Sequence, residues 1–126
     1  MKMEGSTLSR AKIAHEKIIE RDTPFLSICL ETKNASLILL SEGEDHLGTL
    51  AVAIPQTRKM VGPPLSSILL GDRNVIIARA LAERLAEKTK KITLVSVFTK
   101  TFDEREVGPI FLKLLEKTIR MDEGEG

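Results

Sequence analysis

The side chains best suited to metal or nucleophilic chemistry are few. The chain has two histidines, His15 and His46, and one cysteine, Cys29. A zinc site needs three or four ligands in matched geometry, so this supply predicts no metal centre. A nucleophilic cysteine needs an activating base and some exposure, whereas Cys29 lies in an apolar run that is typical of a buried strand. We therefore expect surface or boundary histidines and a buried cysteine.

Two other patterns resemble parts of catalytic motifs without completing one. Gly71 and Asp72 precede a helical pattern, where free backbone amides can attract an anion. The Asp72 carboxylate would repel a phosphate, however, and it is a good helix N-cap. Ser66 and Ser67 lack the glycines of a nucleophile elbow. The other carboxylates lie mostly on helix faces or in turns, where solvated charges are expected, so we expect no catalysis and no cofactor.

One surface segment is a candidate for partner binding. Arg58, Lys59, Met60 and Val61 combine charge with apolar surface in a long loop over 56–65. A Gly-Pro-Pro sequence keeps this loop out of helices and strand ladders, and long loops in compact domains are often functional. A plain mobile connection is the alternative.

The composition is that of one globular domain in a reducing compartment. The 126 residues are 42% hydrophobic and 29% charged, with a net charge of +1, so charge alone gives no case for nucleic acid or membrane partners. One cysteine allows no internal disulfide, and no apolar run approaches the ~20 residues that span a bilayer. We expect a single cytoplasmic domain over 1–126, with its core at about 12–120 and a flexible acidic tail at 122–126.

The apolar patterns predict an α+β fold. The stretch at 8–20 has helical spacing, and short turns between the first predicted strands favour antiparallel neighbours. Two amphipathic helices are predicted to pack on one face of a mostly antiparallel sheet. The first begins at an Asp72 cap and repeats Ile77, Leu81 and Leu85, and the second has Pro109 in its first turn. The strands are predicted at 25–30, 36–40, 47–54, 66–70 and 92–99.

The strand at 92–99 is apolar on both faces, which predicts a dimer. Two helices cover one side of a sheet, and monomers avoid leaving an exposed apolar patch on the order of several hundred Å². A homodimer is the simplest case, and a heterodimer with a related chain is the alternative. The assignment of the two alternating sets of side chains to the covered and uncovered faces could also be reversed. The residues assigned to this dimer interface are Ala51, Ala53, Thr93, Val95, Val97 and Thr99.

Three short motifs, in this order of elements, carry a family resemblance: LGTLAVA at 47–53, SSILLGD at 66–72 and LAERLAEKTKK at 81–91. Together they resemble the small proteasome assembly chaperones of types three and four, and the last motif looks most like type four. The resemblance implies a helix-covered antiparallel sheet, with a strand around 15–19 in place of the helix that the spacing indicates.

The same resemblance implies a function. Members of this family pair as dimers and bind α-type proteasome subunits during ring assembly, and we expect this chain to be released on maturation. The alternatives left open are a small-molecule or nucleotide-binding regulatory domain, a subunit of another complex, and a hydrolase with an unrecognised site.

Overall fold

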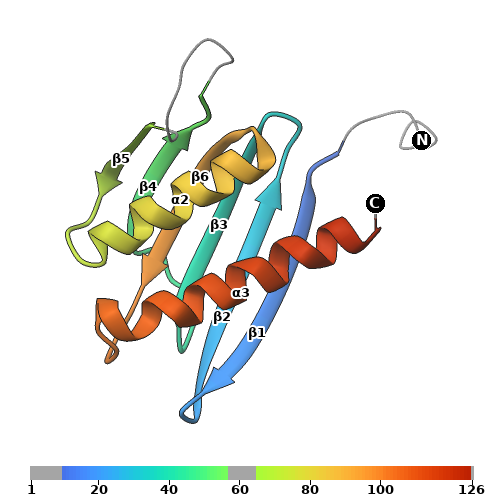
Figure 1. Cartoon of the computed structure of the whole chain (residues 1–126). Coiled ribbons are helices and arrows are strands. Elements are labelled where there is room, and N and C mark those ends of the chain that lie inside the picture. Colours follow the sequence, from blue (N-terminus) through green and yellow to red (C-terminus); the bar gives the residue numbers. More distant parts are fainter. Residues whose placement is uncertain (1–9, 57–64, 126) are drawn as a thin grey trace.

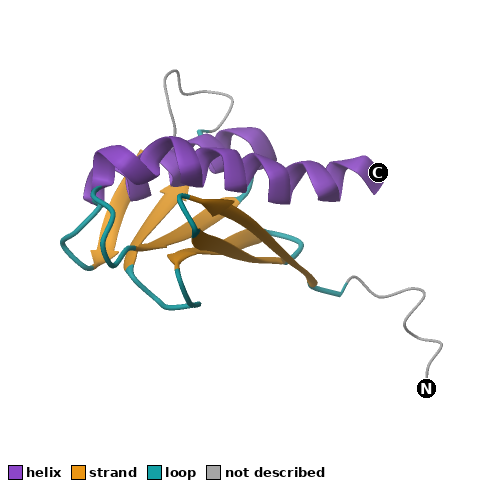
Figure 2. Cartoon of the chain, turned by 90° about the horizontal axis from the view of Figure 1, so that it is seen from below, coloured by secondary structure: helices purple, strands orange, loops and turns teal. Residues whose placement is uncertain are grey.

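The computed structural model describes residues 10–56 and 65–125. These residues form a six-stranded sheet in the order β1-β2-β3-β6-β4-β5 (Figure 1). Both helices lie on the same side of this sheet (Figure 2). The elements are β1 (Lys12–Glu20), β2 (Thr23–Glu31), β3 (Ala35–Glu42), β4 (Thr49–Ile54), β5 (Leu65–Leu70), α2 (Val75–Thr89), β6 (Ile92–Phe98) and α3 (Glu104–Glu125). The predicted α+β class, mostly antiparallel with two helices on one face, is confirmed.

The strand β6 occupies a position that turn lengths did not predict. Short turns favoured pairing of β3 with β4, but β6 lies between them, parallel to β3 and antiparallel to β4. The expectation of antiparallel neighbours was therefore wrong at this point. The connection from β3 to β6 contains β4, β5 and α2, which is long enough for a parallel crossover. An interior position also suits a strand that is apolar on both faces.

The first strand, β1, replaces the helix indicated by residue spacing over 8–20. It pairs antiparallel with β2, from Lys12 opposite Glu31 to Glu20 opposite Thr23. Arg21 and Asp22 form the connecting turn with φ angles of 51° and 62°. Two consecutive positive φ angles match a tight hairpin whose twist suits the flanking strands. The strand implied around 15–19 by the family resemblance is confirmed, and the helix indicated by spacing was wrong.

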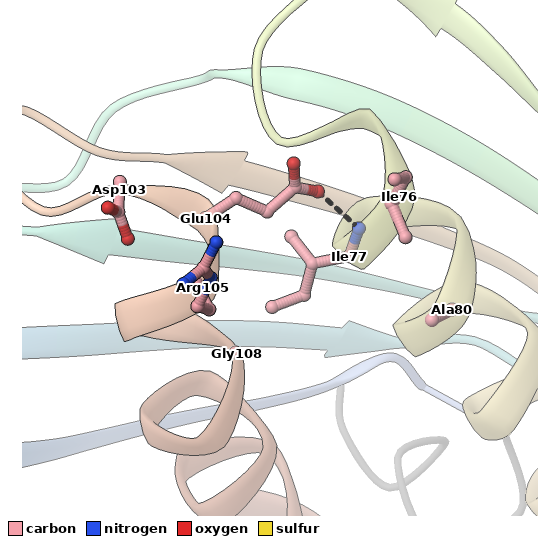
Figure 3. Close-up of a pocket in the computed structure, with 7 residues that line it drawn as sticks. All are labelled: Ile76, Ile77, Ala80, Asp103, Glu104, Arg105 and Gly108. Atoms are coloured by element: carbon pink, nitrogen blue, oxygen red, sulfur yellow. Dashed lines mark hydrogen bonds between the residues drawn. The ribbon is translucent and has the colours of Figure 1, made fainter.

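The helix α2 is capped by a residue from another element. Its N-cap is Asn74, which makes no side-chain cap hydrogen bond, so the assignment of this role to Asp72 was wrong. Instead, the amide of Ile77 donates to Glu104 Oε2 over 2.8 Å. Figure 3 shows Glu104 reaching from α3 to this amide. A carboxylate at the N-terminus of a helix accepts a hydrogen bond from an otherwise unpaired amide and complements the helix dipole.

Replacing Glu104 with Ala is expected to destabilise the fold by about 1 kcal/mol, the usual cost of losing a helix cap. Asp72→Ala is the matched control, because it removes the carboxylate that the sequence pattern favoured as the cap. That change is expected to stay within about 0.5 kcal/mol, as for an exposed side chain. Urea unfolding of the two variants measures both values, and an equal loss in both would contradict the capping role of Glu104.

The helix α3 begins earlier and ends later than predicted. Its start is set by a reciprocal pair, in which the Glu106 amide donates to Asp103 Oδ1 and the Asp103 amide donates to Glu106 Oε1, both over 2.9 Å. Pro109 therefore lies inside the helix and not in its first turn. The helix continues to Glu125, so most of the tail expected to be flexible belongs to it.

The core lies between the helices and the sheet. α2 packs on β4, β5 and β6, while α3 packs on β1 and β2. The predicted stripe on α2 is confirmed, because Ile77, Leu81 and Leu85 are buried along with three of the four alanines of this helix. Beneath α3, the ring of Phe25 stands edge-on to Phe102 and Phe111, with centroids 5.2 and 5.6 Å away. Such edge-to-face contacts hold the second helix to the sheet at a defined place.

The open sheet face as a candidate interface

The side of the sheet turned away from α2 and α3 is rich in large aliphatic side chains. We call it the open face. Ile13 on β1 remains 66% exposed and Leu65 on β5 63% exposed, so the apolar surface extends from one edge strand to the other. A continuous apolar surface of this kind marks an interaction site. Its large apolar residues are Ile13, Ile19, Leu26, Ile28, Leu30, Leu37, Leu39, Leu50, Val52, Ile54, Leu65, Ile92, Leu94 and Phe98.

One end of the open face is covered by the segment 43–48, which connects β3 to β4. The Gly48 amide donates to Ser96 Oγ over 2.8 Å, and the His46 amide donates to Ser41 Oγ over 3.1 Å. The ring of His46 lies 4.3 Å from that of Phe98, centroid to centroid. These contacts bury the two serine hydroxyls and give them partners, so this end of the open face is closed within the chain.

The residues predicted to form the dimer interface lie on the opposite side of the sheet. All six are buried within the single chain on the helix-covered face, so their assignment to the uncovered face was wrong: Ala51, Ala53, Thr93, Val95, Val97 and Thr99. The reason is steric. Ala78, Ala82 and Ala86 of α2 are also fully buried, and small residues on both elements let the helix approach the strands closely.

The residues suited to metal or nucleophilic chemistry are scattered over the molecule. Cys29 is buried, as predicted. His15 is exposed on β1, whereas His46 lies at the covered end with Nε2 3.5 Å from Glu44 Oε1. Within the described ranges, no group of three or more histidine, cysteine or acidic side chains could hold a metal ion. The predicted partner-binding residues Arg58, Lys59, Met60 and Val61 lie outside the described residues.

A buried carboxylate was missed by the sequence reasoning, which treated turn carboxylates as solvated. Glu42, at the end of β3, is 3% exposed. It accepts hydrogen bonds from the Lys100 amide at 2.8 Å, from the Thr101 amide at 3.0 Å and hydroxyl at 2.6 Å, and from the Phe102 amide at 3.2 Å. This carboxylate therefore holds the loop that leads from β6 into α3.

The same contacts control the ionisation of Glu42. Burial by itself raises the pKa of this carboxyl, but hydrogen bonds from the Thr101 hydroxyl and the amides of Lys100, Thr101 and Phe102 outweigh burial and lower the pKa below its ordinary value. Glu42 is consequently an anion at neutral pH. Since all its donors come from this chain, its role is structural.

The two glycines in the family-like motifs meet at one end of the sheet. A side chain at Gly48 would place its Cβ 2.1 Å from the Val97 carbonyl oxygen. Gly71 has a φ of +94°, and a Cβ there would lie 2.5 Å from Thr49 Oγ1. Glycine is required at both places because the backbone passes too close to its neighbours for a side chain. These motif positions therefore shape the fold, and they bring β4, β5 and β6 together.

A sheet with one helix-covered face and one broad apolar face defines a protein-interaction domain. The chain matches the family model of proteasome assembly chaperone 4 over residues 21–97. This match covers more than half of the sequence, so the chain belongs to that family and is a proteasome assembly chaperone. A search of curated proteins found no match.

The fold has a counterpart among solved structures. A chain in a crystal structure described as a novel chaperone complex for yeast 20S proteasome assembly superposes with a TM-score of 0.67 at 17% identity. The similarity covers 91% of this chain and 97% of the yeast one. The predicted family resemblance is therefore confirmed by the family match, and the expected fold by the structural one. No helix in the described part of the chain is long and apolar enough to cross a membrane.

Proposed function

We propose that this chaperone acts as a dimer that binds α-type proteasome subunits during ring assembly and leaves as the particle matures. The open face supports the dimer, because pairing two copies through it would remove a large apolar surface from water in each chain. A homodimer is the simplest form, and a related chain with a similar face is the alternative partner. The family's role in proteasome assembly favours an α-type subunit as the client, meaning the protein that this chaperone binds.

Binding and release need no chemistry within the chain. A chaperone has to bind specifically and then leave, which suits a modest and partly polar client interface. If a later assembly partner takes the same subunit surface, mass action displaces the weaker binder. We therefore propose a cytoplasmic, non-enzymatic binding protein that uses neither cofactor nor metal.

The direct test is a titration of the purified chain with isolated α-type subunits, half-assembled particles and finished cores. We expect binding to the first two and exclusion from finished cores, because a later assembly partner would by then occupy the subunit surface that the chaperone binds. Failure to bind any isolated α-type subunit, or stoichiometric retention in finished cores, would show the proposal to be wrong. Native mass spectrometry reads both outcomes.

The loop at 56–65 stays a prediction for client contact. Arg58 and Lys59 would orient the encounter through charge, while Met60 and Val61 would supply apolar contact. Reversal of Arg58 and Lys59 to Glu is expected to weaken client binding about tenfold or more, and unchanged affinity would place the contact elsewhere. The dimer mass should not change, which separates a client effect from an assembly effect.

A further inference from the structure

The two ends of the sheet carry charge of opposite sign. Strand pairing brings together the start of β1, the β2–β3 turn and the link between α2 and β6 at one end (Figure 1). The segments 10–12, 31–34 and 90–91 of this end hold five cations and one anion. The segments 42–45 and 103–106, at the other end, hold six anions and one cation. The net charge of +1 therefore hides a basic end and an acidic end.

A hollow of about 250 Å³ lies at the basic end. Lys91 is fixed within it, because its Nζ donates to Glu31 Oε2 and to the Thr32 carbonyl, each over 2.9 Å. The two side chains of this ion pair are only 24% and 21% exposed, so the one carboxylate of the hollow already faces a fixed cation. The lining residues are Arg10, Lys12, Glu31, Thr32, Lys33 and Lys91.

Three cations of the hollow have no such partner. Arg10, Lys12 and Lys33 are exposed, and they form neither a hydrogen bond nor an ion pair with another residue of the described ranges. By contrast, Lys113 on α3 is also exposed but pairs with Glu20 over 3.2 Å. Three like charges around one hollow repel each other, and an anion placed among them would relieve that repulsion. The hollow therefore favours an acidic partner.

The hollow lies on the helix side of the sheet, clear of the open face. Ser27 of β2 contacts Thr118 of α3, and by the alternation of a strand Glu31 points to the same side. A dimer formed through the open face would therefore leave the hollow accessible. The loop proposed for client contact joins the sheet at the same end, because β4 ends beside the start of β6 and pairs there with the start of β5.

We propose that this hollow binds an acidic segment of the client, whose carboxylates pair with Arg10, Lys12 and Lys33. The inference rests on the proposed function and adds the chemistry of the client surface. A protein segment fits better than a nucleic acid, because single-stranded bases stack on aromatic side chains and none lines the hollow. Glu31 would also repel a continuous row of phosphates, whereas spaced carboxylates can reach the cations around it.

The test is the double variant Arg10→Glu with Lys33→Glu in the full chain. Both side chains are exposed and lie outside the strands, so the fold should tolerate the changes. Lys12 is left unchanged because it lies opposite Glu31, and a second carboxylate there would weaken the pairing of β1 with β2.

The matched control is Arg73→Glu with Arg105→Glu, which changes the net charge equally at the acidic end. Both side chains are exposed, and they lie just before α2 and in the first turn of α3, where an acidic residue suits the helix dipole. The melting temperature and the dimer mass should therefore stay those of the wild type in both double variants.

We expect the Arg10→Glu, Lys33→Glu variant to bind isolated α-type subunits at least about 20-fold more weakly than the wild type, and the control to bind within about twofold. Added salt should weaken the wild type more than this variant, because the ion pairs at the hollow are screened. A Glu-rich peptide should displace the subunit from the wild-type chain, and duplex DNA of the same total charge should compete less well.

Three results would overturn the proposal for the hollow while the proposed function stands. They are a variant that binds within about twofold of the wild type, a control that is weakened equally, and DNA that competes better than the peptide. A wild-type chain that binds no α-type subunit would instead overturn the proposed function, and this inference with it. One titration series therefore distinguishes the two failures.

Discussion

Replacing Leu94 with Asp is expected to convert the proposed dimer into monomers. Leu94 lies in the middle of the open face, opposite Leu37 of β3 on one side and Val52 of β4 on the other. A carboxylate buried there against a second apolar sheet would have no partner, at a cost of about 3 kcal/mol or more. The dimer dissociation constant should therefore rise at least about 100-fold. Light scattering at micromolar concentration should show one 13.9 kDa chain in place of two.

The control for this change is Ala80→Asp, which adds the same side chain to the exposed side of α2. That variant should remain dimeric. Ile13→Asp provides a second test at the edge of the open face, where the side chain is exposed in the single chain and the fold should tolerate the change. Folded Leu94→Asp and Ile13→Asp variants that both keep the mass of the wild-type dimer would rule out the open face as the interface.

Much of the secondary structure could be predicted because its signals are local. The buried stripe of α2, Ile77, Leu81 and Leu85, repeats at helical spacing within nine residues. The strands β2 to β6 likewise alternate over short runs between turn residues. Local periodicity failed at β1, because its apolar residues fit a helix about as well as a strand. There the pairing with β2 decides the structure, and a pairing partner is not visible in one segment.

The contacts that position the ends of elements could not be predicted because they join distant parts of the chain. Glu104 caps α2 from 27 residues beyond Ile77, while Asp72 has the right residue type and lies next to the helix. Glu42 holds a loop about 60 residues further along the chain. Residue type identifies possible acceptors, but the fold decides which of them a helix or loop meets.

Which face of the sheet forms the candidate interface could be predicted only in part. Alternation correctly divided β6 into two sets of side chains, but it does not say which set the helices cover. The positions of the alanines did indicate which face the helix covers. Ala51 and Ala53 on β4 are small, and three alanines lie on the buried face of α2, so the helix can lie close to the strand where small residues meet. The larger side chains of Leu50 and Val52 on the other face then remain for a partner.

Replacing Glu42 with Gln is expected to destabilise the fold strongly. The carboxylate accepts four hydrogen bonds from donors on Lys100, Thr101 and Phe102. Gln removes the charge and turns one acceptor oxygen into an NH2 donor that faces other donors. Hydrogen bonds to a buried charged group contribute strongly, so the loss of unfolding free energy should be about 2–3 kcal/mol at pH 7. Glu44→Gln in the same turn is the control, because the Glu44 side chain is 76% exposed.

The pH dependence gives a second, independent measure of Glu42. Its pKa in the folded chain lies below the ordinary value of 4.5, so the unfolded chain binds the proton first as the pH falls. The stabilisation by Glu42 is therefore complete above about pH 4.5 and is lost as the pH drops through the lower folded pKa. Chemical unfolding of wild type and Glu42→Gln across this range should show the difference shrinking with acidification. A difference that stays constant down to the acid limit would mean that Glu42 acts through its shape and not through its charge.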